Sequence, residues 1–141
     1  MTTYSLVYPM FAMVLLTAGV LVTLFRSRTR AVRENQVSSA FYRTFQGGSE
    51  PESSAKPARH FVNLFEAPTL FYAACLAAMV TQLAGPLIQA LAWAYVAARI
   101  VHAYVHLGRN RLRHRIPVYG TSWLILLVMW VYIVTNVAQH T

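Results

Sequence analysis

Three polar residues stand at helical spacing where the chain enters an apolar stretch. Arg59, Asn63 and Glu66 follow an i, i+4, i+7 pattern, which places them on one face of a helix. Arginine grips carboxylates through its planar fork, an amide bonds peptide groups, and a carboxylate accepts an ammonium. This face is therefore a candidate polar site at the edge of the apolar stretch, although Asn63 could equally serve only as a contact between helices.

A second polar face follows in the next apolar stretch, where Arg99, His102 and His106 share one side of a helix with Arg109. An ionisable residue inside a membrane helix is costly, so it faces the protein interior and finds a partner. Because Arg99 and the acid of the first face lie at comparable depth, we expect a buried ion pair between them. The histidines are expected to bond between helices, with haem or metal ligation as the alternative. With no matching histidine expected in another apolar stretch, no metal site is predicted.

The elements that carry these faces are predicted to be membrane-spanning helices. About 20 apolar residues cross a bilayer, and four ranges satisfy that length: 5–25, 61–84, 86–107 and 117–138. The first range has arginines after it and no basic region before it, so a signal peptide is a poor alternative. Gly85-Pro86 is predicted to make the middle two ranges a tight hairpin, and Pro68 is predicted to bend the second helix.

Basic residues gather in two of the predicted connections. One connection covers residues 26–60 and the other residues 108–116. Under the positive-inside rule both loops face the cytoplasm and both termini face the opposite side. Residues 46–57 are rich in Gly, Ser and Pro and are expected to be irregular, whereas the segment just after the first span could extend its helix.

Composition supports one membrane domain. The 141 residues are 57% hydrophobic and 11% charged, against about 25% charged residues in ordinary soluble domains. Twelve Lys and Arg residues against four acids would suggest nucleic acid in a soluble protein. Here they lie between apolar runs, so no nucleic-acid partner is predicted. Cys75, the single cysteine, is expected to be a small buried hydrophobe.

Taken together, the motif Arg59-x-x-x-Asn63-x-x-Glu66 and the later stretch AARIVHAYVHLGRNR resemble the membrane-associated proteins in eicosanoid and glutathione metabolism (MAPEG). The resemblance covers essentially the whole chain and is closest to a generic bacterial-type member. It implies an all-α integral membrane four-helix bundle that assembles as a homotrimer. It also implies glutathione as co-substrate, bound in a cytoplasm-facing cleft between subunits.

The resemblance also implies roles for individual residues. Arg59, Asn63 and Glu66 match the glutathione-contacting face of the second helix, and Arg99 matches an arginine of the third. Arg113 or Arg115 would stabilise the glutathione thiolate, and Arg26 or Arg30 would contact a carboxylate of the ligand. Tyr119 matches a family tyrosine, although it could instead be an interfacial anchor.

Several positions depart from the family pattern. Ala67 stands where eicosanoid synthases can place a tyrosine after the glutamate. His102 and His106 occupy places where other members can carry aromatic hydroxyls, which argues against an eicosanoid substrate.

The function expected from these residues is a glutathione-dependent transferase or peroxidase. A cation beside a thiol lowers the thiol pKa below its ordinary value of about 8.5, so the protein would activate a bound thiol for attack on a hydrophobic electrophile or a lipid hydroperoxide. Two alternatives remain open. One is a non-enzymatic membrane subunit or scaffold with the same fold, and the other is a haem- or quinone-binding membrane protein.

Overall fold

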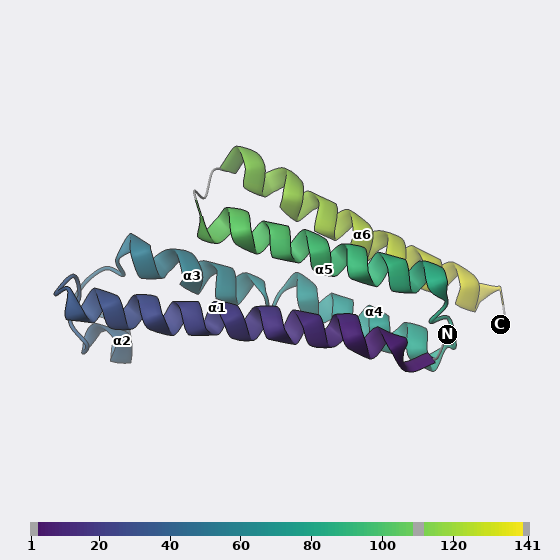
Figure 1. Ribbon diagram of the computed structural model, residues 1–141, viewed down its shortest axis with the longest axis horizontal. Coiled ribbons are helices and arrows are strands. Elements are labelled where there is room, and N and C mark those ends of the chain that lie inside the picture. Colours follow the sequence, from purple (N-terminus) through teal and green to yellow (C-terminus); the bar gives the residue numbers. More distant parts are fainter. Residues whose placement is uncertain (1–2, 109–111, 140–141) are drawn as a thin grey trace.

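A computed structural model describes residues 3–108 and 112–139, and every regular element in these two ranges is a helix (Figure 1). The elements, in chain order, are the 3-10 helix η1 (Thr3–Leu6) and the α-helices α1 (Val7–Arg33), α2 (Phe41–Thr44), α3 (Glu52–Asn63), α4 (Ala67–Val80), α5 (Pro86–Leu107) and α6 (Leu112–Ala138).

The long helices lie side by side along one direction. α1 packs against α3, α5 packs against α6, and α4 packs against α6. The start of η1 and the end of α6 lie at the same end of the molecule (Figure 1). The last turns of α1, all of α2, the end of α5 and the start of α6 lie toward the opposite end, which we call the basic end. The described arginines of both basic segments therefore lie toward one end of the molecule.

Three helical segments are long and apolar enough to cross a membrane. They are Val7–Arg33, Glu52–Val80 and Arg113–Ala138. The helix α5 was expected as a further span and is a continuous helix of 22 residues, but it is not one of these three. Its polar residues, including Arg99 and two histidines, lower its average hydropathy. That α5 spans the membrane stays a prediction.

Helices extend farther into the predicted loops than the sequence suggested. α1 continues to Arg33, as its polar tail allowed, and α3 already begins at Glu52 in a segment expected to be irregular. α6 begins at Leu112, so Arg113 and Arg115 lie on its first turns instead of in a loop. Arg109 and Arg111 lie outside the described residues.

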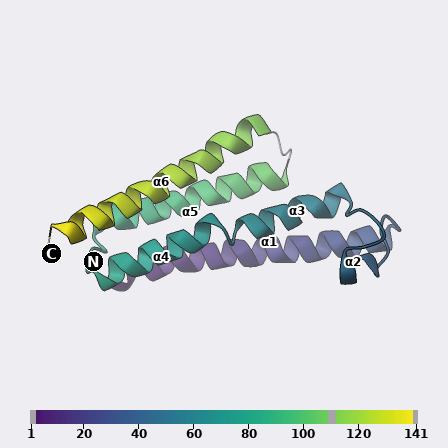
Figure 2. The same cartoon turned by 180° about the vertical axis from the view of Figure 1, so that it is seen from behind.

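The second span is interrupted between α3 and α4, and the break is plain from behind (Figure 2). α3 ends at Asn63 and α4 begins at Ala67. Pro68 explains the break, because it lies in the first turn of α4 and has no N–H to continue the hydrogen-bond ladder to Leu64. The backbone tightens there, with the N–H of Phe65 donating to the Val62 carbonyl at 2.9 Å. Instead of the bend predicted at Pro68, the helix is interrupted between Asn63 and Ala67, just before the proline.

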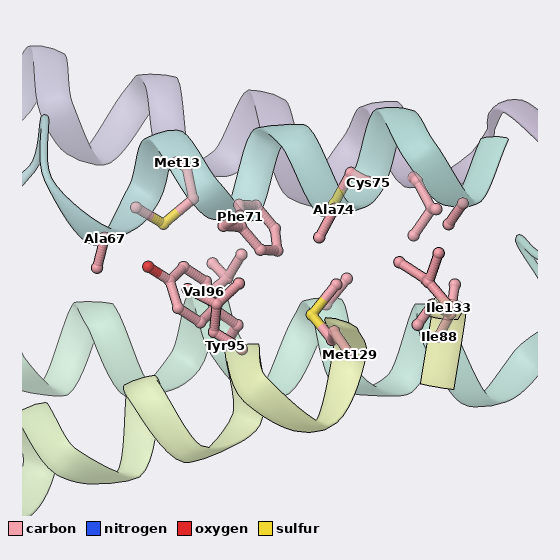
Figure 3. Close-up of a cluster of buried hydrophobic side chains, with 14 of the residues drawn as sticks. Met13, Ala67, Phe71, Ala74, Cys75, Ile88, Tyr95, Val96, Met129 and Ile133 are labelled. Atoms are coloured by element: carbon pink, nitrogen blue, oxygen red, sulfur yellow. The ribbon is translucent and has the colours of Figure 1, made fainter. Parts of the chain in front are cut away.

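The core lies between α4, α5 and α6, with α1 contributing Met13 (Figure 3). Phe71 of α4 and Tyr95 of α5 stack with ring centroids 4.4 Å apart. Cys75 is a fully buried free thiol, which confirms its expected role as a small apolar side chain. Gly85 caps the start of α5 at Pro86, so the predicted Gly-Pro boundary is confirmed.

Candidate functional site

The first polar face is divided by the helix break. Arg59 and Asn63 lie on the last turns of α3, whereas Glu66 lies in the break and precedes α4. The expected single face of one continuous helix is therefore wrong. Arg59 and Glu66 are exposed, and Asn63 is half-buried.

Arg99 is fully buried, with 0% of its surface exposed, and its first partner is an amide. Its Nη2 donates to the Asn63 side-chain Oδ1 at 2.5 Å and to the Asn63 carbonyl at 3.4 Å. The Asn63 Nδ2 in turn donates to the Glu66 Oε2 at 3.3 Å. None of the ion pairs within residues 3–108 and 112–139 joins Arg99 to Glu66. The expected direct ion pair is thus corrected: Asn63 stands between the two charges and bonds both.

Three histidines form a buried cluster beside this network. His102 and His106 lie on the same face of α5 as Arg99, as expected, and His60 of α3 packs against both. The His60 ring centroid is 5.4 Å from that of His102 and 4.9 Å from that of His106. His60 was not among the expected site residues, because it lies one residue before the apolar range 61–84 and a matching histidine was sought only in the apolar ranges.

The position of His60 could have been found from the sequence. His60 and Asn63 are three residues apart, so both fall on the same side of a helix. The sequence reading gave Arg59 that place, and Arg59 is exposed. Within the described ranges, no group of His, Cys, Asp or Glu has an arrangement that could hold a metal ion.

The start of α6 completes the cluster. The Arg115 Nη1 lies 3.4 Å from the His106 Nε2. Tyr119, one turn farther on, has its ring centroid 5.4 Å from that of His102 and lies 5.8 Å from the Arg99 guanidinium carbon. Arg113, the other candidate for the thiolate, is exposed. The structure therefore brings Arg115, rather than Arg113, to the polar cluster.

Arg26 and Arg30 lie elsewhere. Both are exposed on the last turns of α1, and the Arg30 Nε pairs with the Glu34 carboxylate at 2.6 Å. Among the described residues, no recorded contact joins either arginine to the histidine cluster. One chain by itself thus assembles the α3, α5 and α6 parts of the expected site but not its α1 part.

The cluster is rich in polar atoms that lack partners within the described chain. They are His60 Nδ1 and Nε2, His102 Nδ1 and Nε2, His106 Nδ1, Arg99 Nε and Nη1, and Tyr95 Oη. A buried polar group without a hydrogen bond costs about 1–3 kcal/mol. Such a concentration of unpartnered donors and acceptors, with two guanidinium groups and one exposed carboxylate, is suited to a polar ligand with anionic groups.

The comparison with protein-family models decides the family. The model of the MAPEG family matches residues 6–135, which include every residue of the cluster. The chain belongs to the MAPEG family. No curated protein and no solved structure shows significant similarity to this MAPEG protein. The family holds glutathione-dependent transferases and peroxidases as well as members without enzymatic activity.

Proposed function

We propose that this MAPEG protein is a glutathione-dependent membrane transferase or peroxidase. The observation that carries the proposal is the buried polar cluster, in which Arg99, Asn63 and Glu66 form one hydrogen-bonded chain and Arg115 contacts His106. The arginines of the cluster are complementary in charge to the two carboxylates of glutathione, and the Glu66 carboxylate is complementary to its ammonium group. Membership of the MAPEG family supports glutathione as the thiol that this site binds.

In this proposal Arg115 stabilises the thiolate. It lies at the edge of the cluster and is half-buried, so its charge is less screened than that of the exposed Arg113. A cation at this place lowers the pKa of the bound thiol. The thiolate sulfur then attacks either an electrophilic carbon, displacing its leaving group, or the outer oxygen of a hydroperoxide. In the second case the O–O bond breaks and the departing alkoxide takes a proton.

The proposed assembly is a homotrimer of four-helix bundles with the ligand between subunits. Support comes from the separation of Arg26 from the cluster of its own chain. In a trimer, α1 of a neighbouring subunit would supply Arg26 to a glutathione carboxylate. Arg26 suits this role better than Arg30, which already pairs with Glu34.

The test is an ultraviolet difference titration with glutathione, read at the thiolate band. We expect a saturable band in the parent protein. In Arg115→Gln we expect apparent affinity for the thiolate to fall about ten- to a hundred-fold, because a charge-assisted contact is worth about 1.5–3 kcal/mol. Arg113→Gln is the matched control and should behave like the parent. Equal losses in both variants would show that net charge, not the position of Arg115, is responsible.

One observation favours a second function. Arg99 is completely buried and bonded to α3 of its own chain, which suits a scaffold or membrane subunit whose buried polar contacts hold its helices in the arrangement needed for assembly. In that case Arg99→Leu disturbs the packing of α3 on α5 and thereby dissociates the oligomer, as measured by size in detergent, while glutathione changes neither the spectrum nor the melting temperature of the parent.

A further inference from the structure

Arg115 contacts a side chain of the neighbouring helix. Arg115 lies near the start of α6 and is half-buried, and His106 lies in the last turn of α5 with 6% of its surface exposed. The Arg115 Nη1 is 3.4 Å from the His106 Nε2. Because α5 and α6 pack against each other, this contact fixes a long side chain of α6 against an ordered part of α5.

The chemistry of the two groups decides which form of His106 makes this bond. A guanidinium carries only N–H donors and stays protonated in proteins, so the His106 Nε2 must be the acceptor. The imidazole is therefore neutral, with its proton on Nδ1. A protonated imidazole would have no lone pair on Nε2 and would repel the guanidinium.

The surroundings of His106 favour this neutral form. Two other imidazole rings lie beside it, with the His60 centroid at 4.9 Å and the His102 centroid at 5.7 Å. The charged groups that act on His106 in the described part of the chain are cations, namely Arg59 of α3, Arg99 of α5 and Arg115 of α6. A further positive charge among them is unfavourable in a poorly hydrated site, so the imidazole stays available as an acceptor.

A neutral acceptor holds an arginine without cancelling its charge. The chain has four acids; three of them pair with basic residues outside the cluster, and Glu66 is bonded by Asn63. Arg99, the other arginine of the cluster, likewise donates to a neutral group, the Asn63 Oδ1, at 2.5 Å. A carboxylate in either place would offset the positive charge, whereas an imidazole or an amide leaves that charge to act on a ligand.

The position of the Arg115 guanidinium matters because its effect on a bound thiol falls with distance. An arginine side chain is long, and at the edge of a membrane protein it readily extends toward water or lipid headgroups. The bond to His106 holds it at the cluster instead. This bond uses one of the five N–H donors that a guanidinium carries, so it is compatible with a contact to a thiolate.

We propose that His106 is a positioning residue of the thiol site, whose neutral imidazole holds the Arg115 guanidinium at the cluster with its full charge directed at a bound thiolate. This inference rests on the proposed function. It gives His106 a role that acts through Arg115 instead of through direct contact with the ligand. The site then distinguishes an ionised sulfur from an uncharged one.

The experiment compares two amides of different reach at this position. In His106→Gln the side-chain Oε1 takes about the place of the imidazole Nε2, whereas the amide of His106→Asn is one methylene shorter and does not reach Arg115. The full-length protein in detergent is saturated with glutathione, and the thiolate band is followed against pH to give the pKa of the bound thiol. We expect that pKa to stay near the parent value in His106→Gln and to rise by about one unit in His106→Asn.

A second ligand separates positioning of Arg115 from support of the whole site. S-methylglutathione keeps the carboxylates and the ammonium of glutathione but has no ionisable thiol, so its dissociation constant should be the same in the parent and in both variants. His114→Asn is the control for the loss of an imidazole, because His114 is exposed on α6 next to Arg115. It should match the parent with both ligands.

The outcomes distinguish this inference from the function on which it rests. Equal pKa values of the bound thiol in His106→Gln and His106→Asn would overturn the inference alone, because the band of the parent would still show an activated thiol. A parallel loss of S-methylglutathione binding in His106→Asn would also overturn it, since His106 would then support the whole site. A parent protein without a thiolate band would overturn the proposed function and this inference with it.

Discussion

At the scale of single residues, Asn63 links two charged side chains. Its side chain accepts a hydrogen bond from the buried Arg99 and donates one to Glu66. The sequence analysis predicted that these three residues lie near one another, but it predicted a direct ion pair between Arg99 and Glu66. It could not show the intervening amide, because spacing gives the face of a helix and not the order of the contacts on it.

Asn63→Ala should lower the free energy of unfolding by about 1–3 kcal/mol, because it removes the side-chain acceptor of a buried guanidinium and leaves only the longer bond to the main-chain carbonyl. The measurement is thermal or denaturant unfolding of the purified protein in detergent. Gln46→Ala removes an exposed amide and should change stability by less than about 0.5 kcal/mol. A stability of Asn63→Ala equal to that of the parent would mean that Arg99 finds another acceptor at no cost.

At the scale of elements, the contact between α3 and α5 is built around imidazole rings. His60 sits between His102 and His106, and both of its ring nitrogens lack a partner within the described chain. Packing of this kind is costly for stability alone. Buried histidines of this kind are better explained by a role in ligand binding or chemistry than by a role in stability.

His60→Phe should therefore raise the free energy of unfolding by about 1 kcal/mol, because an apolar ring of similar shape replaces a buried group without hydrogen bonds. Denaturant unfolding measures the change, and the thiolate titration of the same variant should show weaker binding. His114→Phe is the control, since His114 is exposed on α6. A loss of stability in His60→Phe would instead show that the imidazole makes hydrogen bonds through water.

The sequence indicated the helices but misplaced several of their ends. The boundary at Gly85-Pro86 and the extension of α1 through its arginines could be predicted, because a helix-breaking pair and a polar continuation have clear local signatures. The segment from Glu52 was read as a loop from its Ser and Pro content, yet it forms the first turns of α3. Pro51, just before it, and the acidic Glu52 in its first turn favour a helix start. Tertiary contact with α1 then settles a choice that local composition left open.

At the scale of the whole molecule, η1 and the end of α6 lie at one end, and the described arginines of the basic segments lie toward the other. That the basic end faces the cytoplasm, as the positive-inside rule predicts, stays a prediction. The trimer and the position of α5 in the membrane could not be decided from one chain. Both depend on surfaces that meet lipid or another subunit.

Orientation can be tested with a membrane-impermeant maleimide, because the native Cys75 is fully buried and should not react. Ser39→Cys, at the basic end, should be labelled only when the cytoplasmic side is accessible. Gln139→Cys, just after α6, should be labelled from the opposite side. Labelling of both positions from one side of intact spheroplasts would contradict the expected topology.

The break between α3 and α4 has an electrostatic consequence that depends on the main chain alone. A helix that starts inside a bundle places the positive end of its macrodipole there, equivalent to about half an elementary charge. The first turn of α4 thus adds a fixed attraction for anions beside Glu66, while the end of α3 contributes a fixed negative end at Asn63. Side-chain substitution can reshape this region, but its underlying field persists as long as Pro68 keeps the two helices apart.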